Sequence, residues 1–259
     1  MAYYDTIARR WHDITGHKGG VFKELVLNDC ILGRLPSIAR RSILELGAGN
    51  GYFMPLLLRR FSGQAPARIV ITDQSSALLA IAQSHFKVRN AEYYRLDVRA
   101  RYPYPENTFN LILAIMVFNE IGDAGLRRAL RECHRVLTED GRLIAAVTHP
   151  AFVESLSRRG ELKRTSGGRL TMPGALGLRL PVVRRSMDAY ERCLDMSGFE
   201  HESKDIFPSR RVFNGKPGLR KAGHVPVALL LDCHTPPQGP PSEPPGRPDA
   251  PGHRRRKTT

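Results

Sequence analysis

The segment ILELGAGNGYF at positions 43–53 constrains the fold more than any other part of the chain. An apolar run that contains one acid, Glu45, leads into Gly47, Gly49 and Gly51, and the residues that follow can form a helix. Because glycine has no Cβ atom, a turn with this spacing lets the backbone approach a ligand closely. The segment therefore predicts a strand, a tight turn and a helix, with the turn beside a bound molecule.

Strand-like and helix-like segments alternate from residue 42 onward. This alternation is typical of parallel strands that are joined by crossover helices. We expect strands at 42–46, 68–73, 91–97, 109–116, 141–149, 200–207 and 225–233, and helices at 52–61, 75–86, 124–137 and 186–199. The sequence therefore predicts an α/β fold with a doubly wound, seven-stranded, mostly parallel sheet.

Segments outside this alternation suggest three further parts of the chain. Residues 1–41 contain two amphipathic patterns, at 3–15 and 19–32, which we interpret as a helical lid over the strand ends. The main domain is expected to span 42–234, with a loose, loop-like insertion at 151–188 as a cap. Residues 235–259 are rich in Pro and basic side chains and are predicted to be disordered.

The glycine turn differs from the G-x-G-x-x-G pattern of dinucleotide-binding proteins, since its glycines are evenly spaced and an acid precedes them. ELGAGNG resembles the E/D-x-G-x-G-x-G signature of class I S-adenosylmethionine-dependent methyltransferases. The resemblance implies S-adenosylmethionine as cofactor and a bond, direct or through water, from Glu45 to the methionine ammonium. A purely loop-bracing role for Glu45 is the alternative. The implied turn contacts are Glu45, Gly47, Ala48, Gly49, Asn50 and Gly51.

Two further acids match the same family at the ends of the next strands. Asp73 is implied to accept both ribose hydroxyls, although it can also cap the following helix. Asp97 is implied to bond the adenine amino group, while the Val98 N–H serves a ring nitrogen. Gln74 and Leu96 are expected to flank the adenine.

Other cofactor contacts are implied for Ala114 and Ile115, at the end of the fourth strand, and for Tyr4 in the N-terminal helix. His12 shares that helix and is a catalytic candidate, and Trp11 is expected to help exclude water. The alternative is that these aromatic side chains only pack the helix.

His149, directly after the fifth strand, is the first candidate for a catalytic base, because its side chain titrates near neutrality. A pocket-lining or backbone-bonding role is the competing interpretation. Asn119 and Glu120 follow the fourth strand and are candidates to hydrogen-bond the substrate, although Glu120 can also begin a helix. Methyl transfer is an in-line displacement that depends mainly on positioning, so a base is optional.

The net charge of +15 suggests nucleic acid as an alternative partner, because Lys and Arg side chains can neutralise its phosphates. The region after the fourth strand reads AIMVFNE, however, and lacks the N/D-P-P-Y/F run of the enzymes in this superfamily that methylate base amines. Four cysteines without a C-x-x-C pair argue against a metal site. No apolar run is long enough to span a membrane, and no signal peptide is recognisable, so we predict a cytoplasmic protein.

The sequence thus predicts a methyltransferase that acts on an oxygen or nitrogen of a small molecule, such as a secondary metabolite. An RNA or DNA methyltransferase and a non-catalytic cofactor-binding accessory protein are the alternatives. The pattern leaves the acceptor and the oligomeric state open.

Overall fold

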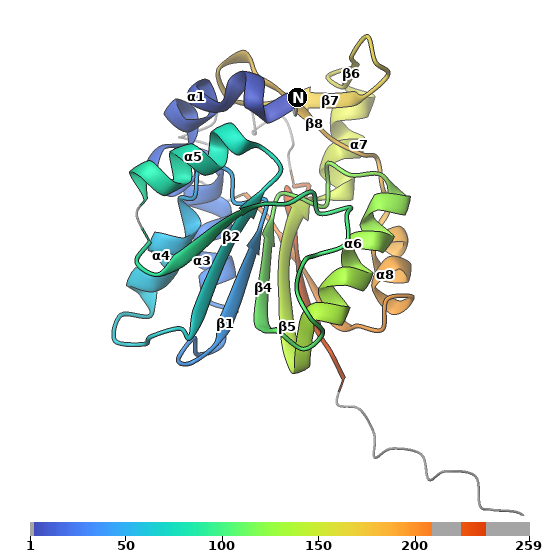
Figure 1. The fold of residues 1–259 in the computed structure, drawn as a ribbon. Coiled ribbons are helices and arrows are strands. Elements are labelled where there is room, and N and C mark those ends of the chain that lie inside the picture. The colour runs from blue at the N-terminus through green and yellow to red at the C-terminus, as the bar shows by residue number, and fades with distance from the viewer. Residues whose placement is uncertain (1–2, 87, 209–223, 237–259) are drawn as a thin grey trace, which may run out of the picture.

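The computed structural model describes residues 3–86, 88–208 and 224–236. Its main sheet has the strand order β3-β2-β1-β4-β5-β10-β9 (Figure 1). Strand β10 is antiparallel to both of its neighbours, and β1 to β5 pair in parallel. The prediction of a doubly wound, seven-stranded, mostly parallel sheet is confirmed. The strands are β1 (Ser42–Leu46), β2 (Arg68–Asp73), β3 (Ala91–Arg95), β4 (Phe109–Ile115), β5 (Leu137–Thr148), β9 (Glu200–Ile206) and β10 (Ala228–His234).

Helices cover both faces of the sheet, with α3 and α4 on one side and α6 and α8 on the other (Figure 1). Successive side chains of a strand point to opposite faces, so β4 contributes to two separate cores. Leu111 and Leu113 pack with the first pair of helices, and Ile112 and Ala114 with the second. Helices α4 (Phe53–Arg60), α5 (Ser76–His85) and α6 (Asp123–Val136) follow β1, β2 and β4, and α8 (Met187–Asp195) precedes β9.

The N-terminal region begins with α1 (Tyr3–Thr15), as the sequence predicts. The expected second helix is instead divided into η1 (Gly16–Lys18), α2 (Gly20–Phe22), the π-helical turn η2 (Lys23–Leu27) and α3 (Asn28–Leu32). Gly19 and Gly20 both have positive φ, at 82° and 78°, and this left-handed backbone interrupts the helix.

The segment that the sequence presents as loop-like is structured, so that interpretation was wrong. It contains helix α7 (Pro150–Arg158) and a three-stranded antiparallel sheet. The strands of this sheet are too short to show a period of two in the sequence. They are β6 (Lys163–Arg164), β7 (Leu170–Pro173) and β8 (Arg179–Pro181), with the short helix η3 (Ala175–Gly177) between the last two.

Helix α1 connects the cap to the main domain above the strand ends (Figure 1). The Tyr3 hydroxyl donates to the Arg179 carbonyl at 2.7 Å, and the Ser75 hydroxyl donates to Asp5 at 2.6 Å. These contacts hold α1 against both the main domain and the 151–188 segment. The predicted disordered tail lies outside the described residues from position 237 onward. Within the described ranges, no helix combines the length and apolarity needed to cross a bilayer.

Candidate functional site

The glycine turn between β1 and α4 has a left-handed backbone at each of its three glycines. Gly47, Gly49 and Gly51 have φ values of 61°, 61° and 81°, in the region that glycine adopts most readily. Two hydrogen bonds fix the turn to the end of β2. The Gly49 N–H donates to Asp73 Oδ2 at 2.8 Å, and the Ala48 N–H donates to the Thr72 carbonyl.

A cavity of about 670 Å³ opens above this turn, at the carboxyl ends of the strands. This is where open α/β sheets bind ligands. The glycine turn and the loops after β2, β3 and β4 supply one side, and α1, η2 and the cap supply the other. Predicted site residues that line the cavity are Tyr4, Gly47, Gly49, Asp73, Gln74, Leu96, Asp97, Val98, Ile115 and Asn119.

Two carboxylates, Glu45 and Asp73, lie at the end of the cavity nearest the turn; Asp73 lines the cavity and Glu45 is buried behind its surface. Glu45 is 2% exposed, and its Oε2 has no hydrogen-bond partner within the described structure. Burial raises the pKa of Glu45 to about 8, against the effect of Lys23, which lowers it. Burial likewise raises the pKa of Asp73, which lines the cavity. An orphaned buried carboxylate beside a glycine turn suits a ligand that presents a cationic amine there.

Asp97 lies at the far end of the cavity, after β3, and is less buried. Arg99 donates two close hydrogen bonds to its carboxylate, at 2.9 and 2.6 Å, and these bonds lower the pKa of Asp97. The Gln74 side-chain amide also donates to Asp97, at 3.2 Å. Leu96 and Val98 are buried beside them and line the same end. The side chains expected around an adenine therefore lie together.

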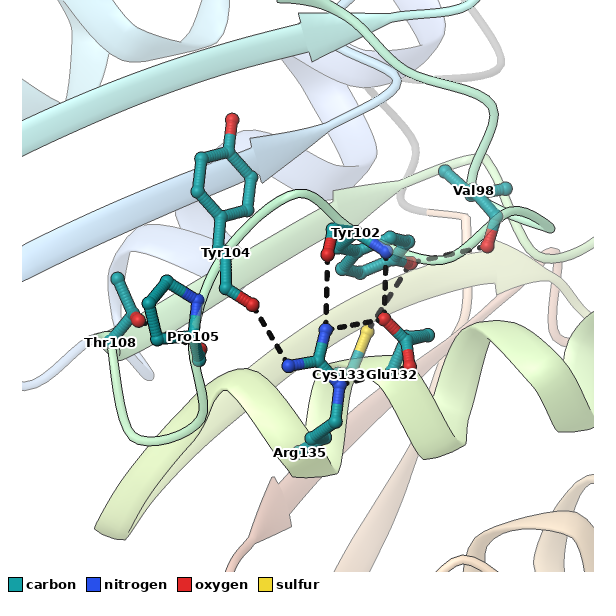
Figure 2. Close-up of polar contacts among 8 residues, drawn as sticks. All are labelled: Val98, Tyr102, Tyr104, Pro105, Thr108, Glu132, Cys133 and Arg135. Carbon is teal, nitrogen blue, oxygen red and sulfur yellow. Dashed lines mark hydrogen bonds and ion pairs between the residues drawn. The ribbon is translucent and has the colours of Figure 1, made fainter.

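The loop that follows Asp97 is fastened to helix α6 by Arg135 (Figure 2). Its guanidinium donates to the carbonyls of Tyr104 and Tyr102, at 2.8 and 3.1 Å, and to Glu132 at 2.6 Å. Glu132 in turn accepts the Tyr102 N–H at 2.7 Å. One arginine thus satisfies several loop groups at once and fixes the path of residues 97–108.

We expect Arg135→Ala to lower the free energy of unfolding by about 1–2 kcal/mol, because several hydrogen bonds are lost from a partly exposed group. The hydrogen bond from Arg135 lowers the pKa of Glu132 in the folded protein. This bond therefore stabilises the fold at pH values above the ordinary glutamate pKa, where Glu132 is ionised. The difference from wild type should therefore shrink as acid protonates Glu132. Urea denaturation at several pH values measures it. The matched control is Arg131→Ala on the exposed face of the same helix; an equal loss there would contradict the role of Arg135.

A second polar group lies at the end of β4. The Tyr4 hydroxyl donates to Glu120 Oε1 at 2.6 Å, and both side chains line the cavity. Burial raises the pKa of Glu120 to about 8. Asn119 is also buried, and its Oδ1 has no hydrogen-bond partner in the described part of the chain. These groups can accept a proton or orient a polar ligand atom.

Several other predicted site residues do not line the cavity. His149 caps helix α7 by accepting the Ala151 N–H at 3.0 Å, and its Nε2 lies 3.0 Å from Asp205. Both ring nitrogens are thus engaged, as in the backbone-bonding alternative. His12 lies 3.1 Å from Asn50 Nδ2, which ties the turn to α1. The remaining residues pack behind the cavity surface: Glu45, Ala48, Asn50, Gly51 and Ala114.

Two lining residues have no signal in the sequence. Lys23 brings an ammonium group from the π-helical turn to the glycine end of the cavity. Met116 follows β4 with φ of 61°, an uncommon conformation for a side chain other than glycine, which clusters at functional sites. Neither residue belongs to a motif, and only the folded chain brings them to the site.

Comparisons with known proteins agree with this geometry. A highly reducing polyketide synthase of Aspergillus nomiae is 29% identical over 156 residues, which cover 57% of this chain and 6% of the synthase. The ubiquinone/menaquinone biosynthesis C-methyltransferase UbiE of Enterobacter is 28% identical over 124 residues, 46% of this chain and 47% of UbiE. The chain thus spans less than half the length of these relatives.

A solved S-adenosylmethionine-dependent methyltransferase from Mesorhizobium loti has the same fold, with a TM-score of 0.63 and 20% identity. The similarity covers 85% of this chain and all of that structure. A methyltransferase-domain family model matches residues 43–141, which run from β1 into β5 and include the glycine turn, Asp73 and Asp97. Residues 43–141 therefore match a methyltransferase domain, and the chain has the fold of S-adenosylmethionine-dependent methyltransferases.

Proposed function

We propose that this protein transfers a methyl group from S-adenosylmethionine to an oxygen or nitrogen of a small, largely apolar molecule. One observation carries the proposal: a single cavity runs from the acidic glycine turn to an apolar pocket under the cap. Donor and acceptor can therefore meet inside the protein. In-line transfer requires this kind of positioning above all.

The donor would occupy the half of the cavity that the main domain forms. Asp73 would hold the ribose, Asp97 the adenine and Glu45 the ammonium, while Gly47 and Gly49 leave space for the methionine chain. When bound, S-adenosylmethionine supplies a methyl group on a sulfonium, whose C–S electron pair stays on sulfur as the acceptor atom bonds to carbon. Helix α1 and the cap would exclude water during this step.

The acceptor would occupy the other half, where most lining side chains are apolar. An apolar pocket with few polar groups favours a small hydrophobic molecule over a nucleic-acid backbone, which requires several cationic contacts. Glu120 lines the cavity and accepts the Tyr4 hydroxyl, and it is the polar group that we assign to the acceptor. The apolar lining includes Ile14, Phe22, Phe152, Met172, Leu176, Leu180 and Val227.

We expect Glu120 to act as the general base when the acceptor carries a proton. Its folded-state pKa of about 8 means that the rate should rise with pH until the carboxyl is ionised near that value. Glu120→Gln should lower turnover by about 10²-fold and remove this pH dependence. The hydrogen bond from Tyr4 lowers the pKa of Glu120, so Tyr4→Phe should move the same limb to higher pH.

This pair of variants separates a base from a packing residue. A pH profile that is unchanged in Glu120→Gln would contradict the assignment. So would a Tyr4→Phe variant whose limb does not move, provided that both variants melt near the wild-type temperature.

The proposed function is tested by supplying the pure protein with S-adenosylmethionine that carries a trideuteromethyl group, together with metabolite extract from the source organism. Mass spectrometry should detect a small molecule that gains this group. Purified RNA and DNA serve as parallel acceptors. Label that appears only in nucleic acid would favour the nucleic-acid alternative, and label that moves nowhere would favour an accessory protein.

A carbon acceptor is the second candidate, because the name of the relative UbiE specifies C-methylation. A carbon acid needs a base to remove its proton, and Glu120 could serve there as well. The position of the transferred group in the purified product, read by NMR, distinguishes carbon from oxygen and nitrogen.

A further inference from the structure

Lys23 places its ammonium group at the glycine end of the cavity. It is the first residue of the π-helical turn η2, a geometry that is frequent at functional sites. Its Nζ lies 4.9 Å from the ring centre of Tyr52 and 5.7 Å from that of Trp11. The Trp11 indole nitrogen would be 3.4 Å from a Cβ at Gly49, so this aromatic pair holds the ammonium beside the turn.

This ammonium has no anionic partner within hydrogen-bond or ion-pair distance in the described structure. The other cation that lines the cavity near the predicted adenosyl position, Arg99, is bonded to Asp97. Lys18, five residues earlier, is paired with Glu24 at 2.7 Å. Burial lowers the pKa of Lys23 to about 8, although Glu45, Glu120 and Asp73 all act to raise it. A buried ammonium without a close partner is costly, and an anion bound there would offset that cost.

The donor presents two opposite charges at this end of the cavity. The α-ammonium of its methionine part suits the carboxylates of Glu45 and Asp73. The α-carboxylate, by contrast, would be repelled by them unless a cation stood close by. We propose that Lys23 binds the α-carboxylate of the donor, so that the amino-acid end is held as a zwitterion between Lys23 and the acidic side of the turn. This inference rests on the proposed function and specifies one subsite of it.

Two ligands that differ only in the amino-acid end test the inference. S-adenosylhomocysteine carries the α-carboxylate, whereas 5′-methylthioadenosine lacks the whole amino-acid part. Lys23→Met keeps the length and apolar stem of the side chain and removes its charge. Isothermal titration should show that Lys23→Met weakens S-adenosylhomocysteine binding about tenfold or more and leaves 5′-methylthioadenosine binding within about twofold of wild type.

Two control variants show whether the effect of Lys23→Met comes from the charge at this position. Lys18→Met removes an exposed, paired lysine from the same segment and should change neither affinity. Lys23→Arg keeps the charge and should retain more S-adenosylhomocysteine affinity than Lys23→Met. Retained binding of 5′-methylthioadenosine also demonstrates that a variant is folded.

Three results would overturn the inference: unchanged S-adenosylhomocysteine affinity in Lys23→Met, an increase in that affinity, or an equal loss for both ligands. An increase would mean that Lys23 obstructs the site. If the wild-type protein binds neither ligand, the proposed function itself fails, so the two failures are distinguishable.

Discussion

Gly51→Ala is expected to lower the free energy of unfolding by about 2–4 kcal/mol, since it combines backbone strain with overpacking. Gly51 has φ of 81°, which an L side chain rarely adopts. A Cβ there would lie 2.6 Å from the Cβ and 3.1 Å from the Cα of Ala82 in helix α5. Because the Cα belongs to the helix backbone, a rotamer change cannot relieve the contact, and the turn or α5 must move.

Gly63→Ala is the matched control for this substitution. Gly63 has a similar φ of 88°, but no atom lies within 4 Å of a Cβ built there. It should therefore show only the backbone effect, of about 1 kcal/mol. Urea or thermal denaturation of both variants gives the difference. Equal stability of the two would mean that the close packing of the turn on α5 does not limit this position.

Asp73→Ala is expected to weaken S-adenosylhomocysteine binding by about 100-fold or more, because charge-assisted hydrogen bonds contribute about 1.5–3 kcal/mol each. The carboxylate does more than face the cavity. Its two oxygens accept the N–H groups of Gly49 and Ser75, each at 2.8 Å, so it also shapes the turn and the start of α5. Isothermal titration measures the loss, and unchanged binding would defeat the ribose assignment.

A ligand series separates the two roles of Asp73. Asp73→Asn keeps the shape of the side chain and one acceptor oxygen. In the wild-type protein, 2′,3′-dideoxyadenosine should bind more weakly than adenosine, because it lacks the hydroxyls that Asp73 would bond. In Asp73→Asn this difference should largely disappear. If the penalty for the missing hydroxyls is the same in both proteins, Asp73 acts only through the backbone of the turn.

Local patterns in the sequence predicted most of the main sheet and the glycine turn beside the cavity. Helix α1 and strands β1 and β2 lie where their periodicity places them. The helix predicted from residue 75 begins as α5 with Ser75 as its cap, since the Ser75 hydroxyl accepts the Leu78 N–H at 3.2 Å. These features depend on residues that are only a few positions apart, so the spacing of residue types along the sequence is enough to predict them.

Contacts between distant residues were decided only by the tertiary structure. The Tyr4–Glu120 bond joins residues 116 positions apart, and the His149–Asp205 contact spans 56. The small cap sheet and the place of Lys23 between two aromatic rings are of the same kind. No periodicity specifies which side chains meet when separate elements pack, because that depends on the relative placement of whole helices and strands. The sequence by itself therefore determined the sheet and its glycine turn, whereas folding decided which charged groups face the cavity.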